Sequence, residues 1–143
     1  ALGHGLVQGM RERGRGAILF TGSAAGHVPL PLHAVYAATK AFDLALGEAL
    51  WAELRASNVD VSVLEPGATE TGFQDVAGEL AHPGASPEEV ARAGLEALGQ
   101  QPSVIVGWYD WIRVNLATRL LTRPIATHVA HATIARQTPE SLR

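Results

Sequence analysis

Three short apolar runs separated by helical stretches restrict the fold of this 143-residue sequence more than any other feature. The runs are "AILFT" at 17–21, "NVDVSVLEPG" at 58–67 and "SVIVG" at 103–107. Runs of this length and composition are typical of strands, and the first has the composition of a strand buried on both faces. Because the strands alternate with helices, the sequence predicts an α/β fold, with a parallel sheet covered by helices.

Apolar stripes predict two of the helices. The first helix covers about 35–57, and its stripe consists of Phe42, Leu46, Leu50 and Leu54. Gly47 interrupts this helix, at a cost of about 1 kcal/mol relative to alanine, and we interpret it as a close helix–helix approach. The second helix has a stripe of Trp108, Ile112, Leu116 and Leu120. We expect it to pack on the sheet or to roof a pocket, with a membrane-interface helix as the alternative. Pro124 then starts a shorter helix.

Other helices are indicated by their ends. The first twelve or so residues have a helical period that stops at Gly14 and Gly16. A later helix has Ser86 as its N-cap and Pro87 at its first position, and Gly99 ends it. The segment between the second strand and Ser86 is predicted to be irregular.

Composition and charge exclude several classes of function. A net charge of −3 gives no clustered basic surface for nucleic acid. The sequence has no cysteine, which excludes disulfides and thiolate metal sites. His128 and His131, with no carboxylate nearby in sequence, do not make a metal site. Residues 16–39 are interrupted too often by glycine and proline to cross a membrane, and no signal peptide is recognisable, so we expect a cytoplasmic protein.

The stretch "ILFTGSAAGHVPLP" at 18–31 has two interpretations. It resembles a glycine-rich loop for a dinucleotide pyrophosphate, or it is a strand end that places Ser23 at the edge of an active site. A pyrophosphate loop needs a helix directly after its glycines, and Pro29 and Pro31 prevent one. The acidic residue expected about 20 positions later is also not convincingly placed. We therefore retain the second interpretation.

The pentapeptide "YAATK" at 36–40 supports an active site. Residues four apart lie on one helix face, so the phenol of Tyr36 and the ammonium of Lys40 can point into one cleft. A nearby cation favours the ionised form of a phenol, and Lys40 keeps donors for the hydroxyl groups of a ligand. Ser23 can donate to a substrate oxygen on which charge develops. Lys40 is the only lysine among eleven basic residues, and lysine and arginine are not interchangeable at such a site.

These motifs, in this order, resemble the catalytic core of the short-chain dehydrogenase/reductase family. "TGSAAG" is similar to the family's strand with the catalytic serine, "VYAATKAF" to its active-site helix, and "PGATETGF" to its loop over the nicotinamide. The resemblance covers nearly the whole chain. It implies the C-terminal half of a Rossmann-like, doubly wound parallel sheet, with three strands and flanking helices.

The resemblance also implies an activity and the residues that carry it. The activity is hydride transfer between NAD or NADP, a choice left open, and a small-molecule carbonyl or secondary alcohol. Tyr36 would be the general acid/base, Ser23 would hold the substrate oxygen, and Lys40 would bind the nicotinamide ribose. The implied cofactor-binding residues are Tyr36, Lys40, Pro66, Gly67, Thr69 and Thr71.

The family's glycine-rich cofactor loop, its Asn-Ala-Gly strand and its catalytic asparagine have no counterpart in these 143 residues. We therefore expect residues 1–143 to be one partial domain that lacks the N-terminal cofactor-binding half. A homodimer or homotetramer is implied for the parent polypeptide, by which we mean the longest natural reading frame that contains these residues. The alternative function is a truncated, catalytically inactive half-domain that acts only through protein association.

Overall fold

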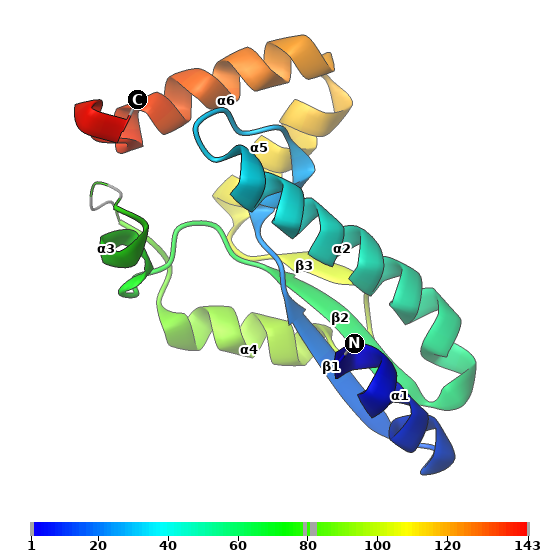
Figure 1. The fold of residues 1–143 in the computed structure, drawn as a ribbon. Coiled ribbons are helices and arrows are strands. Elements are labelled where there is room, and N and C mark those ends of the chain that lie inside the picture. The colour runs from blue at the N-terminus through cyan, green and yellow to red at the C-terminus, as the bar shows by residue number, and fades with distance from the viewer. Residues whose placement is uncertain (1, 79, 81–82, 143) are drawn as a thin grey trace.

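A three-stranded parallel sheet forms the centre of the computed structural model, which describes residues 2–78, 80 and 83–142. Its strands are β1 (Gly16–Thr21), β2 (Val59–Glu65) and β3 (Ser103–Ile105), in the order β1-β2-β3 (Figure 1). Thr21 pairs with Leu64, and Glu65 pairs with Ile105, so the carboxyl ends of all three strands lie at one edge. The predicted α/β fold with a parallel sheet is confirmed.

Helices cover both faces of the sheet (Figure 1). Helices α1 (Leu2–Glu12) and α2 (Ala34–Leu54) pack on one face, over a core that includes Leu54, Val59 and Val61. Helix α4 (Pro87–Ala97) packs on the other face, over Leu64, Val90 and Val106. As a result, residues 61–65 of β2 are buried on both faces.

Strand β1 is less buried than its composition predicted. Its residues are half-buried or exposed, whereas the sequence predicted burial on both faces. Within the described residues β1 pairs only with β2, so its other edge has no strand beside it. The fully buried strand is β2, in the middle.

Helix α2 rests on the sheet through a face that only the C-terminal half of the predicted stripe describes. Leu54 is buried in the core and Leu50 packs against it, whereas Phe42 is 63% exposed and Leu46 is also exposed. The other buried residues of the helix are Ala37, Leu44 and Gly47. Residues four apart rotate by about 40° per step around a helix of 3.6 residues per turn, so a long stripe at that spacing turns away from the sheet. Gly47 packs against the side chains of Val63 and Phe20. The close approach at Gly47 is therefore helix to sheet, and the predicted helix–helix approach is wrong.

The C-terminal helices also differ from the prediction. Helix α5 (Trp108–Arg119) has 12 residues and α6 (Arg123–Gln137) has 15, so the helix that begins near Pro124 is the longer one. Of the two expectations for α5, packing on the sheet is wrong, because its stripe is exposed at Trp108, Ile112, Leu116 and Leu120. That it roofs a pocket stays a prediction. Helix α5 starts just beyond the end of β3. It contacts α6 and the short helix that follows β1, because other helices already cover the sheet.

The segment between β2 and α4 is more ordered than predicted, because it contains a short helix, α3 (Phe73–Ala77). Residues 79 and 81–82 of the same segment lie outside the described residues. The predicted cap of α4 is confirmed, since the amide of Glu89 donates to the Ser86 hydroxyl at 3.1 Å. Among the helices described, none is both long and apolar enough to cross a bilayer.

Candidate active site

Ser23 lies just beyond β1 and is fixed to the end of β2. It is the N-cap of η1 (Ala24–His27), a 3-10 helix, and its Oγ accepts a hydrogen bond from the Ala25 amide at 3.1 Å. The same hydroxyl donates to the Pro66 carbonyl at 3.3 Å, and the Ala24 amide donates to that carbonyl at 3.1 Å. The position of Ser23 is therefore set by the first residue after β2.

Tyr36 and Lys40 lie one turn apart near the start of α2, as the sequence predicted. The Lys40 Nζ is 5.9 Å from the centroid of the Tyr36 ring. The ammonium donates to the Thr21 carbonyl at 2.6 Å and lies 3.5 Å from Asp43 Oδ2. Because an ammonium has three hydrogens, at least one is left for a ligand. Lys40 thus connects the end of β1 to the first turns of α2.

Helix η1 and α2 touch through their main chains at Gly26. A Cβ on this glycine would lie 2.9 Å from both the carbonyl carbon and the carbonyl oxygen of Lys40. Main-chain atoms cannot rotate away as a side chain can. The contact therefore fixes the segment that begins with Ser23 against the turn that carries Tyr36 and Lys40.

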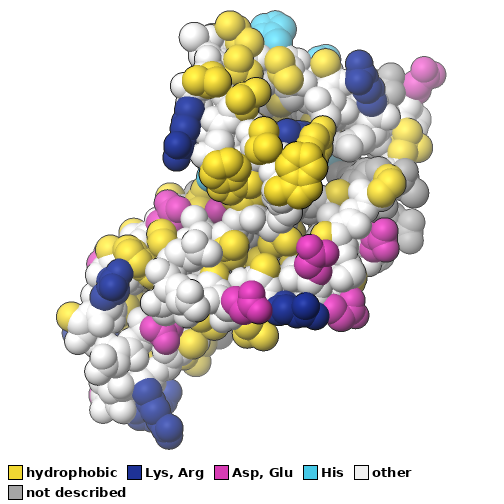
Figure 2. Space-filling view, turned by 180° about the vertical axis from the view of Figure 1, so that it is seen from behind, with side chains coloured by type: hydrophobic (Ala, Val, Ile, Leu, Met, Phe, Trp, Pro, Cys, Tyr) yellow, Lys and Arg dark blue, Asp and Glu magenta, His cyan; other side chains and the backbone are white. Residues whose placement is uncertain are grey.

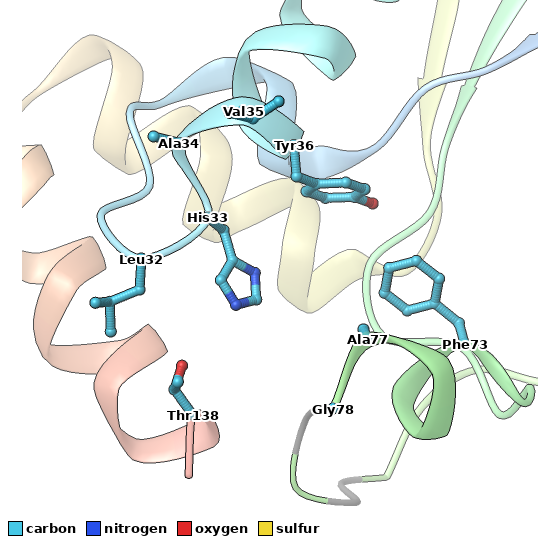
Figure 3. Close-up of a pocket in the computed structure, with 9 residues that line it drawn as sticks. All are labelled: Leu32, His33, Ala34, Val35, Tyr36, Phe73, Ala77, Gly78 and Thr138. Carbon is cyan, nitrogen blue, oxygen red and sulfur yellow. The ribbon is translucent and has the colours of Figure 1, made fainter. Parts of the chain in front are cut away.

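A cavity of about 600 Å³ opens beside Tyr36 (Figure 3). The Tyr36 ring lies at its rim, 5.8 Å from the ring of Phe73 on α3, with an interplanar angle of 44°. The His33 imidazole projects into the space between Tyr36 and Thr138 (Figure 3). Much of the remaining lining is aliphatic, from Leu32, Ala34, Val35 and Ala77. The cavity can thus accept an apolar molecule whose reacting group reaches Tyr36.

Pro66 and Gly67 follow β2 directly, at the same sheet edge as Ser23. The carboxylate of Asp110, in the first turn of α5, lies against Gly67 and leaves no room there for a Cβ. Arg113 Nη1 donates to the Asp110 carboxylate at 3.0 Å. The contact between Gly67 and α5 was not predicted, because nothing in the sequence relates two positions that are 43 residues apart.

Thr69 and Thr71 stabilise the segment after Gly67. Thr69 forms an isolated parallel bridge with Ala85, and its hydroxyl donates to the Gly67 carbonyl at 3.3 Å. The Thr71 hydroxyl accepts from the Phe73 amide at 3.2 Å, at the start of α3. Both threonines therefore have structural hydrogen bonds in this segment.

His27 and Glu65 form a pair that the sequence analysis missed. Glu65, the last residue of β2, is 1% exposed, and its Oε2 lies 2.5 Å from His27 Nε2. The available signal was the single carboxyl side chain in the otherwise apolar run "VSVLEPG". A carboxyl group in a strand that is buried on both faces requires a partner, and His27 is that partner.

The donors present fit the nicotinamide riboside half of a dinucleotide cofactor better than its pyrophosphate. The remaining Lys40 donor, the Tyr36 phenol and the Thr71 hydroxyl suit ribose hydroxyl and amide groups. The glycine-rich segment 22–26 leads into the four-residue η1, so it lacks the α-helix N-terminus that binds a pyrophosphate.

Comparison with known proteins gives the same family as the motifs. The family model of short chain dehydrogenases matches residues 2–80. A 7β-hydroxysteroid dehydrogenase of Clostridium sardiniense is 33% identical over 108 residues, which is 73% of this chain and 41% of that protein. A very-long-chain 3-oxoacyl-CoA reductase of Mycosarcoma maydis is 48% identical over 59 residues, which is 41% of this chain and 17% of that protein.

Solved structures extend the likeness beyond the matched residues. A structure from work on 7β-hydroxysteroid dehydrogenase stereoselectivity superposes with a TM-score of 0.77 at 29% identity, covering 89% of this chain and 50% of that one. A short chain dehydrogenase from Burkholderia cenocepacia in complex with NADP has a TM-score of 0.65 at 27% identity, covering 91% of this chain and 51% of that one. This chain therefore spans about half or less of the length of these relatives. It belongs to the short-chain dehydrogenase/reductase family.

Proposed function

We propose that this chain supplies the catalytic half of an NAD(P)-dependent oxidoreductase that interconverts a carbonyl compound and a secondary alcohol. The observation that carries the proposal is the position of Lys40, hydrogen-bonded to the Thr21 carbonyl and 5.9 Å from the Tyr36 ring. Ser23 lies two residues beyond Thr21, at the same edge of the sheet. A phenol, an ammonium and a hydroxyl at one edge suit proton transfer to an oxygen that is being reduced.

In the proposed reduction, Lys40, Tyr36 and Thr71 would hold the nicotinamide half of the cofactor, which would supply a hydride to the carbonyl carbon. Tyr36 gives its phenolic proton to the carbonyl oxygen, which becomes the alcohol hydroxyl. Lys40 stabilises the phenolate that remains, because a nearby cation favours the ionised phenol. Ser23 turns its hydrogen from the Pro66 carbonyl, at 3.3 Å, toward the oxygen as negative charge develops there. The oxidation is the same sequence reversed.

We propose an apolar carbonyl compound as the class of substrate. The support is the aliphatic and aromatic lining of the cavity beside Tyr36, with His33 and Thr138 as its polar side chains. The names of two relatives, a hydroxysteroid dehydrogenase and a very-long-chain 3-oxoacyl-CoA reductase, are consistent with a largely apolar substrate. NAD and NADP both remain candidates, so an assay has to include both.

The test is an assay of the purified parent polypeptide with NADH or NADPH and a panel of ketones of increasing apolar size. Tyr36→Phe removes only the phenolic hydroxyl, so we expect turnover to fall by about 10²–10⁴-fold, the usual contribution of general acid/base catalysis. Cofactor binding, followed by fluorescence titration, is expected to persist. Tyr109→Phe, at an exposed tyrosine of α5, is the matched control and leaves turnover unchanged. Retention of more than about a tenth of wild-type turnover in Tyr36→Phe overturns the proposal.

A second candidate function is an inactive half-domain that acts through protein association. It is favoured by the edge of β1 that has no strand beside it within the described residues. It is also favoured by the hydrophobic side chains that gather in the upper part of the face seen in Figure 2. The coding DNA upstream of Ala1 separates the two functions. An open frame for a glycine-rich strand, loop and helix supports the enzyme, and a stop codon followed by a start codon supports the half-domain.

Two further expectations from the sequence stay proposals. We propose a homodimer or homotetramer for the parent polypeptide, supported by the exposed side chains of Val35, Phe42 and Leu46 on α2. We also propose a cytoplasmic location, supported by the absence of cysteine from the sequence.

A further inference from the structure

The pair of buried Glu65 and partly exposed His27 joins the two segments that hold Ser23. Glu65 is the last residue of β2, and Pro66 follows it; His27 is the last residue of η1, and Ser23 caps its start. The carboxyl group is 1% exposed, and the imidazole 22% exposed, at an Oε2 to Nε2 distance of 2.5 Å. The pair therefore links the far end of η1 to the strand that also anchors its beginning.

Helix η1 does not hold this position by itself. It has four residues, and the bond from the Gly26 amide to the Ser23 carbonyl, at 2.9 Å, closes its turn. A helix this short has poor internal stability, so its place on the sheet depends on contacts with other elements. Gly26 meets the main chain of Lys40 on one side, and His27 meets Glu65 on another.

The main chain of Glu65 is anchored to β3 and to the residue that follows β3. Its main chain pairs with β3, and its carbonyl accepts from the Val106 amide at 3.1 Å. The backbone from which its side chain extends is consequently a fixed point at the end of the central strand. A hydrogen bond to a fixed point restrains direction as well as distance, which an apolar contact at the same place does not do.

We infer that His27 and Glu65 are a positioning pair that holds Ser23 in register with Tyr36 and Lys40. Neither side chain is assigned a contact with the reacting atoms. The inference rests on the proposed function, because it requires Ser23 to act on the substrate oxygen. An error of about 1 Å in the place of such a group can cost up to about 100-fold in rate.

The main test is the double variant His27→Leu/Glu65→Leu in the parent polypeptide. Replacing both partners of a buried hydrogen bond by apolar residues leaves no group unsatisfied, so the melting temperature is expected to stay close to that of the wild type. We expect kcat for a ketone to fall by about 10- to 100-fold, with the KM for the cofactor within about twofold of wild type. The control is Glu65→Gln, whose amide oxygen still accepts from the imidazole, and it is expected to restore most of kcat.

The same double substitution in a Ser23→Ala background shows whether the pair acts through Ser23. If the pair acts through Ser23, adding the double substitution to Ser23→Ala lowers kcat by less than about twofold, since the effects of coupled residues are not additive. An equal loss in both backgrounds, or an unchanged kcat in the double variant, overturns the inference. If the double variant does not fold, His27→Phe/Glu65→Leu replaces it, because the ring keeps the bulk of the imidazole and no group is left unsatisfied, and the same outcomes are decisive. Failure of the proposed function is recognised separately, from turnover that survives in Tyr36→Phe.

Discussion

Gly26 rests directly on the peptide group of Lys40, at a distance that leaves no room for a Cβ atom. The two residues belong to η1 and α2, the elements that carry Ser23 and Tyr36. The smallest side chain in the segment is thus located where the two halves of the candidate site touch. Its size, and not its conformational freedom, is what the fold requires here.

Gly26→Ala is therefore expected to separate Ser23 from Tyr36 and Lys40. The added methyl group would meet main-chain atoms at 2.9 Å, so η1 or α2 has to move. We expect kcat of the parent polypeptide to fall at least about tenfold, with a smaller loss of stability. Steady-state kinetics and thermal unfolding measure the two effects. Gly5→Ala, where a Cβ meets nothing within 4 Å, is the control, and equal activities of the two variants contradict the prediction.

Phe42→Asp is expected to weaken self-association of the parent polypeptide. Phe42 is 63% exposed on α2, next to other exposed apolar residues, and a carboxylate there would be desolvated in any interface. Light scattering coupled to size-exclusion chromatography should show a dimer or tetramer for the wild type and a smaller species for the variant. Leu120→Asp, at an exposed leucine after α5, should leave the mass unchanged. If the wild type is oligomeric and Phe42→Asp has the same mass, the interface lies elsewhere.

Ser62→Ala is expected to stabilise the protein. The Ser62 side chain is completely buried in β2, and among the described residues its hydroxyl has no hydrogen-bond partner. Removing an unsatisfied buried hydroxyl should raise the free energy of unfolding by about 1 kcal/mol, measured by denaturant titration. Ser103→Ala should lower the free energy of unfolding, because the Ser103 hydroxyl donates to Glu48 Oε1 at 2.8 Å. A less stable Ser62→Ala variant would show that the hydroxyl is in fact satisfied.

The 143-residue chain by itself is expected to bind NADH and NADPH weakly. Its glycine-rich segment leads into η1, and a doubly wound sheet holds its cofactor with loops from both halves. Isothermal titration should give a Kd no lower than about 1 mM for either cofactor, which corresponds to a binding free energy of about −4 kcal/mol. Binding at micromolar strength by a monomer would mean that a loop in this chain does hold the pyrophosphate.

The alternation of strands and helices could be predicted because it depends on local patterns. Ser86 caps α4 through a bond from the amide of Glu89, three residues away, and β2 ends directly before Pro66. Parallel strands that end together also bring Ser23 and Pro66 to one edge, although 43 residues separate them. The roles of Ser23, Tyr36 and Lys40 in catalysis stay predictions, which rest on the motifs and on this geometry.

The faces of the helices could not be predicted, because they depend on what the sheet offers. Helix α2 has apolar residues around much of its circumference, and Gly47 decides which side approaches Val63 and Phe20. The pair of His27 and Glu65 was missed for a related reason. A histidine in a loop and a glutamate at a strand end are each unremarkable until the register of β1 and β2 brings η1 beside Glu65.

The position of Lys40 has a chemical consequence for the whole chain. Its ammonium is partly exposed and bonded to Thr21, and no other side chain in the sequence is a primary amine. Acylating reagents that modify lysine therefore have one side-chain target in these 143 residues, located in the candidate active site. The extent of acylation at Lys40, read by mass spectrometry, is consequently a direct report on whether that site is covered.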